Sequence, residues 1–424
     1  MTGAGVDQKR AGRKEPMRCR HCGGADFLPF LNLGAAPPSN AYIDPRTIAA
    51  EKSYPLEVRT CRCCWLTQTR DFAARETFFT PEYAYFSSFS PTWLAHAEAY
   101  VAMMRHRFAL GPDSLVCEVA ANDGYLLRYV QAAGIRCYGI EPTAGTAAAA
   151  RALGIEMVEA FFGRALATKL AADNRRADLM VANNVLAHVP DINDFAAGFA
   201  TLLKPEGVAT FEFPHLLEMV EGAQFDTAYH EHYSYLSLCA VERIFAAAGL
   251  RIFDIETTPW HGGSLRVFAC RAAARIHKTS AAVAATRRRE VEAGMRGAAF
   301  YGRLQPHADR VREELRTFLA AARREGLQVA AYGAAAKGNT LLNFSGVTAE
   351  DIAFVADRNP HKQGQLLPGS HIPVVSEAEL AARRPDRVLI LPWNLEAEIK
   401  SQLAYVTEWG GRFVTAIPTL KVHA

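Results

Sequence analysis

The sequence predicts an α/β protein built from three parts: a small cysteine-rich N-terminal unit and two Rossmann-like sheets covered by helices. Two close cysteine pairs mark the first part. Short apolar strands alternate with Ala- and Leu-rich helical segments from residue 114, and the alternation restarts at residue 327 after a long helical stretch. Such alternation is typical of parallel sheets with helices on both faces. At roughly 100–200 residues per domain, the 424 residues accommodate three expected units, 15–75, 76–274 and 275–424.

Composition and charge exclude several classes of protein. Hydrophobic residues make up 50% of the chain, too many for a disordered protein, and 47 Lys and Arg against 44 Asp and Glu leave a net charge of only +3. The apolar runs fall short of the roughly 18–20 residues that span a bilayer, and the polar N-terminus lacks a signal-peptide pattern. We therefore expect a soluble, cytoplasmic protein with no membrane association and no nucleic-acid partner.

Four of the nine cysteines form two C-x2-C pairs, Cys19 with Cys22 and Cys61 with Cys64. Paired knuckles of this kind are how a tetrahedral zinc ion collects four thiolates, so we predict a structural zinc site. Cys63 is an alternative to Cys64, because the 38-residue spacer exceeds the about 15–20 residues of compact ribbons. Unmetallated thiols and a redox pair are the competing interpretations. Four thiolates leave no position for a reacting water, so this zinc would hold the fold and would not catalyse.

The middle unit is expected to contain a parallel sheet that ends in an antiparallel hairpin. A helix should run to about residue 107, before the first strand. Strands are predicted at 114–120, 136–141, 156–161, 177–184 and 207–213. Two further strands, 251–258 and 264–271, flank the turn PWHGG and predict a hairpin at the sheet edge.

The turn after the first strand, in CEVAANDGYLL, suits a cofactor. Ligands of doubly wound sheets lie at the carboxyl ends of the strands, where small turn residues let a cofactor approach the backbone. A dinucleotide site would need G-x-G-x-x-G, whereas the positions here carry Glu118, Ala120, Asn122 and Gly124. The turn therefore predicts a different kind of cofactor.

Acidic residues end the first two strands of this sheet, and they favour S-adenosylmethionine. Its ribose hydroxyls and cationic aminoacyl end suit two carboxylates and need no phosphate site. The competing interpretation is that Glu118 and Glu141 only cap strand ends. The expected cofactor set is Glu118, Ala120, Asn122, Asp123, Gly124, Glu141 and Asn183.

The segment QFDTAYHEHYSYLSL, residues 224–238, concentrates histidines and tyrosines just past the carboxyl end of a predicted strand. Titratable groups at this density beside a predicted pocket favour acid/base chemistry near neutral pH. A zincin site would need H-E-x-x-H, a spacing that His230 and His232 lack, so a catalytic metal is disfavoured. Packing or hydrogen bonding alone is the remaining alternative. His188, in NNVLAHVPD, follows the fourth strand on the same side of the sheet.

The last unit begins with a helical stretch from about 275 to 325, which Pro306 is expected to break into two helices. Arg287 to Arg289 are expected on a solvated helix face. Strands follow at 327–333, 351–357, 387–393 and 411–418. The motif AYGAAAKGNTLLNFSG matches neither a dinucleotide fingerprint nor a P-loop, so nucleotide binding and plain packing both remain open.

Taken together, the paired cysteines, EVAANDGYLL, GIEP, NNVLAHVPD, FDTAYHEHYSYLS, HGGSLR and YGAAAKGNTLLNF resemble a known family. It comprises the bacterial C-methyltransferases of nucleotide-linked keto-deoxysugars, such as the tetronitrose C3-methyltransferase. The resemblance covers nearly the whole chain. It implies a zinc-binding domain, a class I methyltransferase core and a C-terminal Rossmann-like domain, with S-adenosylmethionine as cofactor, a nucleotide-linked ketosugar as substrate, and a monomer.

The resemblance also implies roles for individual residues. The active-site residues of the family match Tyr229, Glu231, His232, His188 and Tyr83. The substrate-binding set, which includes residues of the C-terminal domain, would be Lys337, Asn339, Asn343 and His261.

A carbon beside a ketone becomes nucleophilic only after losing its proton, which calls for a base and for donors to the enolate oxygen. The hypothesis is that His232 takes the proton and Glu231 orients it, while Tyr229 and His188 hold the ketone oxygen. Two other classes compete with this function: a zinc-ribbon methyltransferase acting on RNA, protein or another small molecule, and a nonenzymatic scaffold. The sugar, its nucleotide carrier and the methylated carbon are left open.

Overall fold

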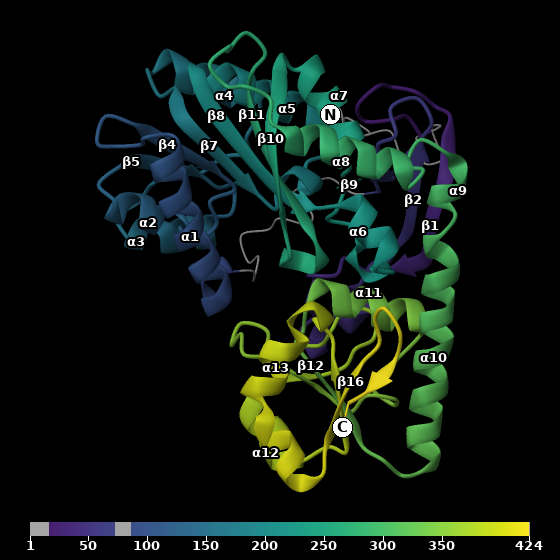
Figure 1. The fold of residues 1–424 in the computed structure, drawn as a ribbon. Coiled ribbons are helices and arrows are strands. Elements are labelled where there is room, and N and C mark those ends of the chain that lie inside the picture. The colour runs from purple at the N-terminus through teal and green to yellow at the C-terminus, as the bar shows by residue number, and fades with distance from the viewer. Residues whose placement is uncertain (1–16, 73–85, 424) are drawn as a thin grey trace, which may run out of the picture.

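The computed structural model describes residues 17–72 and 86–423, which form three sheets (Figure 1). The N-terminal sheet has the order β1-β2-β3-β9 and is antiparallel throughout. Its last strand comes from the histidine and tyrosine segment of the middle unit, so the cysteine-rich unit and the core share one sheet. The bounds of its strands are β1 Phe27–Ala36, β2 Tyr54–Cys61, β3 Thr67–Thr69 and β9 Ser234–Tyr235.

The core sheet has seven strands in the order β10-β11-β8-β7-β4-β5-β6. Five strands are parallel, and the hairpin β10–β11 is antiparallel and lies at one edge, as the sequence predicts. The order reverses between β4 and β7, and a ligand of such a sheet binds at this switch point. The strands are β4 Leu115–Val119, β5 Arg136–Ile140, β6 Glu156–Val158, β7 Ala177–Asn183, β8 Leu203–Pro214, β10 Leu250–Thr258 and β11 Ser264–Arg271.

Helices cover both faces of the core sheet, because its strands are apolar on both sides. Leu170, Phe199 and Ile244 from three helices pack on one face, and Tyr100 and Val130 pack on the other. The helices are α1 Pro91–Arg107, α2 Leu127–Ala132, α3 Ala144–Ala152, α4 Arg164–Ala172, α5 Ile192–Leu202, α6 Leu216–Glu221 and α7 Leu238–Ala247. Short 3-10 turns lie between them: η3 Ser87–Phe89, η4 Leu186–His188, η5 Phe225–Thr227 and η6 Trp260–Gly262.

Helices α8 (Ala281–Glu292), α9 (Ala298–Tyr301) and α10 (Leu304–Arg324) connect the core to the C-terminal unit. The prediction that Pro306 breaks this stretch is wrong. Pro306 lies in the first turn of α10, where its missing N–H has no intrahelical partner to lose. The break lies before it, near Gly294, which has a φ of +84°. As expected, Arg287 to Arg289 are exposed.

The C-terminal sheet has the order β14-β13-β12-β15-β16-β17. Helix α11 lies at the junction between this unit and the core, as Figure 1 shows. The strands are β12 Val329–Tyr332, β13 Val355–Ala356, β14 Val374–Val375, β15 Arg387–Ile390, β16 Arg412–Thr415 and β17 Lys421–Val422. The helices are α11 Ala336–Ser345, α12 Glu377–Arg383 and α13 Glu396–Gln402, with 3-10 turns η7 Trp393–Leu395 and η8 Ala404–Trp409. Within residues 17–72 and 86–423, no helix is both long and apolar enough to span a bilayer.

Candidate functional site

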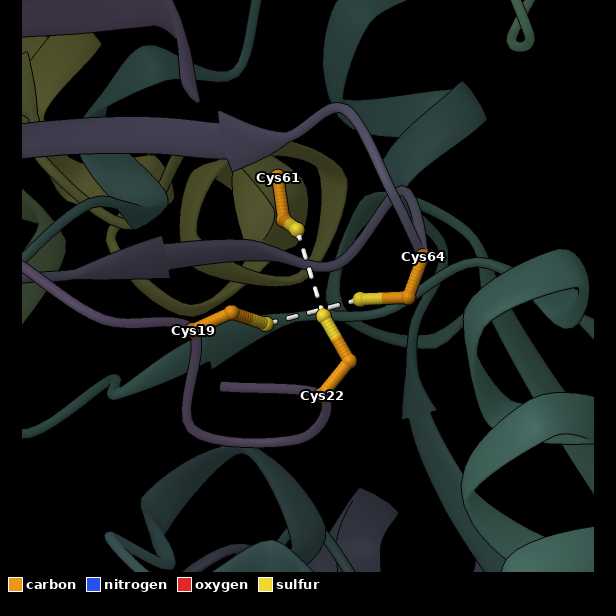
Figure 2. Close-up of side chains that lie close together, drawn as sticks. All are labelled: Cys19, Cys22, Cys61 and Cys64. Atoms are coloured by element: carbon orange, nitrogen blue, oxygen red, sulfur yellow. Dashed lines mark hydrogen bonds between the residues drawn. The ribbon is translucent and has the colours of Figure 1, made fainter. Parts of the chain in front are cut away.

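The four cysteines predicted as zinc ligands lie together. The sulfurs of Cys19, Cys22, Cys61 and Cys64 are all within 4.8 Å of one another and point to a common centre (Figure 2). Four ligands at a Zn–S distance of about 2.3 Å would place their sulfurs roughly 3.8 Å apart, so the cluster fits a tetrahedral zinc ion. Cys63 is exposed and outside the cluster, which makes Cys64 the fourth ligand.

The turn between β4 and α2 has an unusual backbone. Ala120, Asn122 and Gly124 have φ values of +59°, +50° and +78°, so the chain bends tightly at the strand end. A side chain at Gly124 would place its Cβ 2.5 Å from Cδ1 of Ile155, which explains the glycine. Asn122, Asp123 and Gly124 are buried, so the turn is packed within the core at the strand end where a cofactor is expected.

Residues of the segment before α1 fasten this turn. The amide of Ser87 donates to Oδ1 of Asn122 at 2.9 Å, and the amide of Ser88 donates to Oδ2 of Asp123 at 3.1 Å. Within the described part of the chain, Oδ1 of Asp123 is buried without a partner. The side chains of Asn122 and Asp123 thus hold the preceding segment beside the turn.

Two buried glutamates flank the turn, and they differ in their partners. The carboxylate oxygens of Glu118 have no hydrogen-bond partner of ordinary geometry among the described residues. Burial raises the pKa of Glu118 well above its usual value, and Tyr125 opposes that rise. A buried carboxylate at this strand end, whose burial Tyr125 offsets only in part, fits the ammonium group of S-adenosylmethionine, which would pair with it.

Glu141 is already engaged. Its Oε2 accepts from the amide of Asn122 at 3.0 Å, and its Oε1 accepts from the amide of Thr143 at 3.0 Å. Each oxygen of a carboxylate has a second lone pair, so Glu141 keeps the capacity to accept from ribose hydroxyls. Asn183, at the end of β7, is also buried, and its Oδ1 has no partner among the described residues.

His232 is a neutral imidazole held by its two hydrogen-bond partners. Its Nδ1 lies 2.8 Å from the carbonyl of Thr227, and its Nε2 lies 2.7 Å from the hydroxyl of Tyr229. A carbonyl can only accept, so Nδ1 carries the proton and Nε2 accepts from the tyrosine. Burial lowers the pKa of His232 well below its usual value, and nearby His188 lowers it further. The imidazole is therefore neutral near pH 7, with a lone pair on Nε2.

His188 lies beside His232, with the two ring centroids 4.6 Å apart. Its Nδ1 lies 2.9 Å from the carbonyl of Glu231, so Nδ1 is again the protonated nitrogen. Burial lowers the pKa of His188 to about 4. A neutral ring with the proton on Nδ1 presents only an acceptor at Nε2. The predicted donation from His188 to a ketone oxygen is therefore wrong for this form of the ring.

The side chain of Glu231 does not orient His232, contrary to the hypothesis. It accepts from Asn40 instead, at 3.1 Å from the backbone amide and 3.3 Å from Nδ2. The carbonyl of Thr227 takes the orienting role. Sequence reasoning missed it because a backbone carbonyl carries no residue signature.

Lys337, at the start of α11, reaches the same region from the C-terminal unit. Its ammonium donates to the carbonyl of His261 at 3.3 Å and lies 4.9 Å from the ring centroid of Trp393. The indole of Trp393 donates to Oδ2 of Asp226 at 2.8 Å. Burial raises the pKa of Asp226 to about 6, although the charge of Lys337 opposes that rise. Burial also lowers the pKa of Lys337, while Asp226 opposes that fall.

The cluster of Lys337, Asp226, Trp393 and His261 joins the core to the C-terminal unit beside His188 and His232. Nε2 of His261 lies 3.2 Å from Nδ2 of Asn184, at the end of β7. Burial lowers the pKa of His261 to about 4. Sequence reasoning missed Asp226 and Trp393, although the second is the last residue of a predicted strand, at the carboxyl end where functional residues gather.

The two asparagines predicted to bind substrate have internal partners. Nδ2 of Asn339 donates to the carbonyl of Ser39 at 2.6 Å, and Nδ2 of Asn343 donates to the carbonyl of Pro368 at 3.0 Å. Asn343 lines a separate groove of about 790 Å³ between β1 and α10, so the structure does not bring it to the histidines. Tyr83 lies outside the described residues.

Sequence comparisons match the three units in order. Three family profiles fit successive parts of the chain: a zinc binding domain over residues 19–79, a methyltransferase domain over 93–255, and a C-methyltransferase C-terminal domain over 259–418. The C-methyltransferase NovU of Streptomyces niveus is 35% identical over 405 residues, covering 95% of this chain and 96% of that protein.

Solved structures show weaker likenesses. Magnesium protoporphyrin IX methyltransferase of Synechocystis PCC 6803 with bound SAM is 17% identical, with a TM-score of 0.33 over 42% of this chain and 79% of that chain. The 1,6-didemethyltoxoflavin-N1-methyltransferase of Burkholderia thailandensis is 18% identical, with a TM-score of 0.35 over 49% of this chain and 95% of that chain. These likenesses are too weak to carry a functional argument.

Proposed function

We propose that this chain, which belongs to the C-methyltransferase family, methylates a nucleotide-linked keto-deoxysugar at the carbon next to its ketone. Its core is an S-adenosylmethionine-binding methyltransferase domain, and its N-terminal unit is a zinc-binding domain. The observation that carries the proposal is the neutral His232, whose Nδ1 is fixed by Thr227 and whose Nε2 keeps a lone pair. Transfer to carbon requires such a base.

The chemistry begins with proton removal. Nε2 of His232 takes the proton from the carbon beside the ketone, and the electron pair of the C–H bond moves into the enolate. The cofactor, when bound, supplies an electrophilic methyl group at the end of β4. Glu118 would hold its ammonium group and Glu141 its ribose hydroxyls. Burial of the site excludes water, which would otherwise reprotonate the enolate.

The enolate oxygen needs donors, and two groups of this chain suit that role. The hydroxyl of Tyr229 turns from His232 to the oxygen as His232 gains the proton. The charge of Lys337 lies in the same cluster and stabilises the developing negative charge. His188 instead accepts a hydrogen bond from a sugar hydroxyl through Nε2. A monomer suffices for this arrangement, since all the named groups come from one chain.

A methyl-transfer assay tests the proposal. The protein is incubated with isotopically labelled S-adenosylmethionine and separate panels of nucleoside-diphosphate ketosugars, RNA and proteins. We expect label only in a ketosugar and on carbon, as located by mass spectrometry and NMR. Label in RNA or protein would support the alternative, a zinc-ribbon methyltransferase of macromolecules, and no transfer at all would support a nonenzymatic scaffold.

Binding of the sugar nucleotide is tested separately. Lys337→Ala should weaken binding of the nucleotide sugar in isothermal titration while leaving S-adenosylmethionine binding unchanged, because Lys337 contributes charge on the substrate side only. Lys278, on the connection outside the cluster, provides the control variant Lys278→Ala. Equal affinity in both variants would leave packing as the role of Lys337.

A further inference from the structure

We propose that Arg20, which lies between the first two zinc ligands, is a positioning residue that holds the loops of both catalytic histidines. This inference rests on the proposed function for the roles of His188 and His232. It assigns to the zinc-binding unit a part in forming the active site, beyond holding its own fold.

The guanidinium of Arg20 joins the zinc knuckle to both loops. Its Nη1 donates to the carbonyl of Pro190 at 2.9 Å, and its Nη2 donates to the carbonyl of Thr69 at 2.8 Å. Its Cζ also lies 5.2 Å from the ring centroid of Tyr233. Pro190 is two residues from His188, and Tyr233 follows His232 directly. One side chain therefore contacts both catalytic segments.

Thr69 carries the contact to His232. Its hydroxyl donates to the carbonyl of His232 at 3.2 Å, and its amide donates to the carbonyl of Tyr233 at 3.1 Å. The peptide groups before and after Tyr233 are thus fastened to β3. Arg20 holds β3 in turn through the carbonyl of Thr69, so its removal would loosen the backbone that presents His232.

Further hydrogen bonds tie the two loops together. The amide of Tyr233 donates to the carbonyl of Ala187 at 2.8 Å, and Nδ1 of His188 donates to the carbonyl of Glu231 at 2.9 Å. Each histidine therefore depends on the position of the other's loop. Arg20 holds the outer side of this pair of loops.

The zinc cluster fixes the position of Arg20. The backbone amide of Arg20 donates to Oε1 of Gln68 at 3.0 Å, and Nε2 of the same glutamine donates to the sulfur of Cys19 at 3.1 Å. The neighbouring His21 forms a second tether, because its Nδ1 lies 2.7 Å from Oδ1 of Asn193. The knuckle is thus docked on the core at two points.

The burial of Arg20 supports a role in positioning other groups. Its side chain is only 7% exposed, whereas its acidic partner among the described residues, Asp71, is 58% exposed. A cation that only stabilised the surface would remain in water. Burial removes the solvation of its charge, and an ion pair with an exposed carboxylate compensates poorly for that loss. The guanidinium of Arg20 instead contacts mainly two backbone carbonyls and an aromatic ring. Such contacts fix the positions of the groups that they join, because a guanidinium donates its hydrogen bonds in fixed directions.

The test compares Arg20→Met, Arg20→Lys and Thr69→Val with Arg62→Met, a control for an arginine in the same unit whose side chain is 51% exposed. Two readouts are combined. The first is solvent deuterium exchange at the acidic carbon of a nucleoside-diphosphate ketosugar, without the methyl donor. The second is the ¹⁵N spectrum of the imidazoles without substrate, assigned with His188→Asn and His232→Asn.

We expect Arg20→Met to slow exchange by about 10- to 100-fold and to shift the His188 and His232 resonances, with zinc content and S-adenosylmethionine affinity unchanged. Arg20→Lys should recover part of the exchange rate, because a lysine can reach one of the two carbonyls. Arg62→Met should behave as wild type. Unchanged spectra and exchange in Arg20→Met would overturn the proposal.

If Arg20→Met loses zinc or does not fold, Thr69→Val decides, because it removes only the hydroxyl that holds the His232 carbonyl. We expect slower exchange and a shifted His232 resonance; wild-type values for both would contradict the proposal. If the wild-type protein exchanges no ketosugar proton, the proposed function fails. The imidazole spectra still decide whether Arg20 positions the two rings.

Discussion

At the scale of single residues, the protonation state of the histidines determines what the site can do. His232 and His188 both bond a backbone carbonyl through Nδ1, so both present a lone pair at Nε2 when neutral. At His232 the hydroxyl of Tyr229 lies at hydrogen-bond distance from that nitrogen, and under the proposed mechanism it turns to the substrate oxygen. In our proposal, His232 is the base and His188 is a neighbour that binds substrate.

Replacing the base should remove the chemistry and spare binding. His232→Asn keeps a polar side chain but loses the basic nitrogen, so we expect methyl transfer to fall by about 10²–10⁴-fold. Titration calorimetry should give near-wild-type affinities for S-adenosylmethionine and substrate. His230→Asn is the matched control, because His230 points to the carbonyl of Tyr54 at 3.0 Å. A His232→Asn enzyme with near-wild-type turnover would exclude this base.

The lowered pKa of His232 predicts the acid side of the pH profile. The base acts only when unprotonated, so kcat/KM should stay constant as pH falls through 6.5, the ordinary value for histidine, and decline only below it. The measurement is kcat/KM between pH 4.5 and 8 on protein shown to be folded. An acid limb centred at or above pH 6.5 would show that the free enzyme does not depress this pKa.

The same burial links stability to pH. His188 and His261 have folded pKa values of about 4 against an ordinary 6.5, so the unfolded chain binds more protons between these values. Their contribution to the free energy of unfolding is complete above pH 6.5 and is lost as pH falls toward 4. Denaturant unfolding of wild type and His261→Gln across this range should show a smaller loss in the variant. Parallel losses would contradict the linkage.

How far the sequence predicts the site depends on what each role requires. The zinc ligands can be predicted from the spacing of the cysteines alone, because the site needs only four thiolates that converge on one point. The structure also brings His188, His232, His261 and Lys337 together, as a shared strand-end location suggests. Thr227 supplies its own backbone carbonyl, and Arg20 donates to the backbone carbonyls of other residues. No side-chain motif reveals such contacts. The protonation of His188 depends on which nitrogen meets a carbonyl, and only coordinates show that.

At the scale of elements, the turn between β4 and α2 is tightly constrained by its own packing and backbone conformation. Gly124→Ala adds a methyl group 2.5 Å from Ile155 at a φ of +78°, so we expect weaker S-adenosylmethionine binding and a loss of roughly 1–3 kcal/mol in stability. Gly134→Ala is the control, because its φ is +71° with open space around the added atom. Calorimetry and denaturant unfolding measure both effects. Equal effects in the two variants would mean that backbone strain alone matters.

Strands and helices of the core follow from the sequence because each strand is a short apolar run bounded by turns. Three features of the fold do not follow from the sequence. The strands β14 and β17 have only two residues each, too short for a periodic signal. Pro306 predicts a break but starts a helix, since proline fits both positions. The pairing of β9 with β3 joins segments far apart in the chain, and local patterns do not contain such contacts.

At the scale of the whole molecule, the three units meet at one place. The zinc-binding unit supplies Asn40 and Arg20, the core supplies His188 and His232, and the C-terminal unit supplies Lys337. The strand pairing of β3 with β9 and the packing of α11 on the core keep these groups together. The near-zero net charge is compatible with the proposed small anionic substrate, because such a substrate would need only a few local cations.

Loss of zinc should therefore affect the active site as well as the N-terminal unit. Cys61→Ser removes a buried ligand, so we expect less than one zinc per chain, a lower melting temperature and reduced proton exchange. Cys63→Ser, at an exposed sulfur outside the cluster, is the matched control and should behave as wild type. Metal analysis and thermal unfolding measure the first two effects. Zinc loss in Cys63→Ser but not in Cys61→Ser would contradict the assigned ligand set.

The most direct test of the central claim is the position of the transferred methyl group. The enzyme is supplied with methyl-¹³C-labelled S-adenosylmethionine and nucleoside-diphosphate ketosugars in D₂O, and the product is analysed by NMR. A base-generated enolate predicts a new ¹³C–¹³C or C–CH₃ connectivity beside the ketone, together with deuterium exchange at that carbon in wild type but not in His232→Asn. A methyl group on oxygen or nitrogen, or exchange that persists in His232→Asn, would contradict the account.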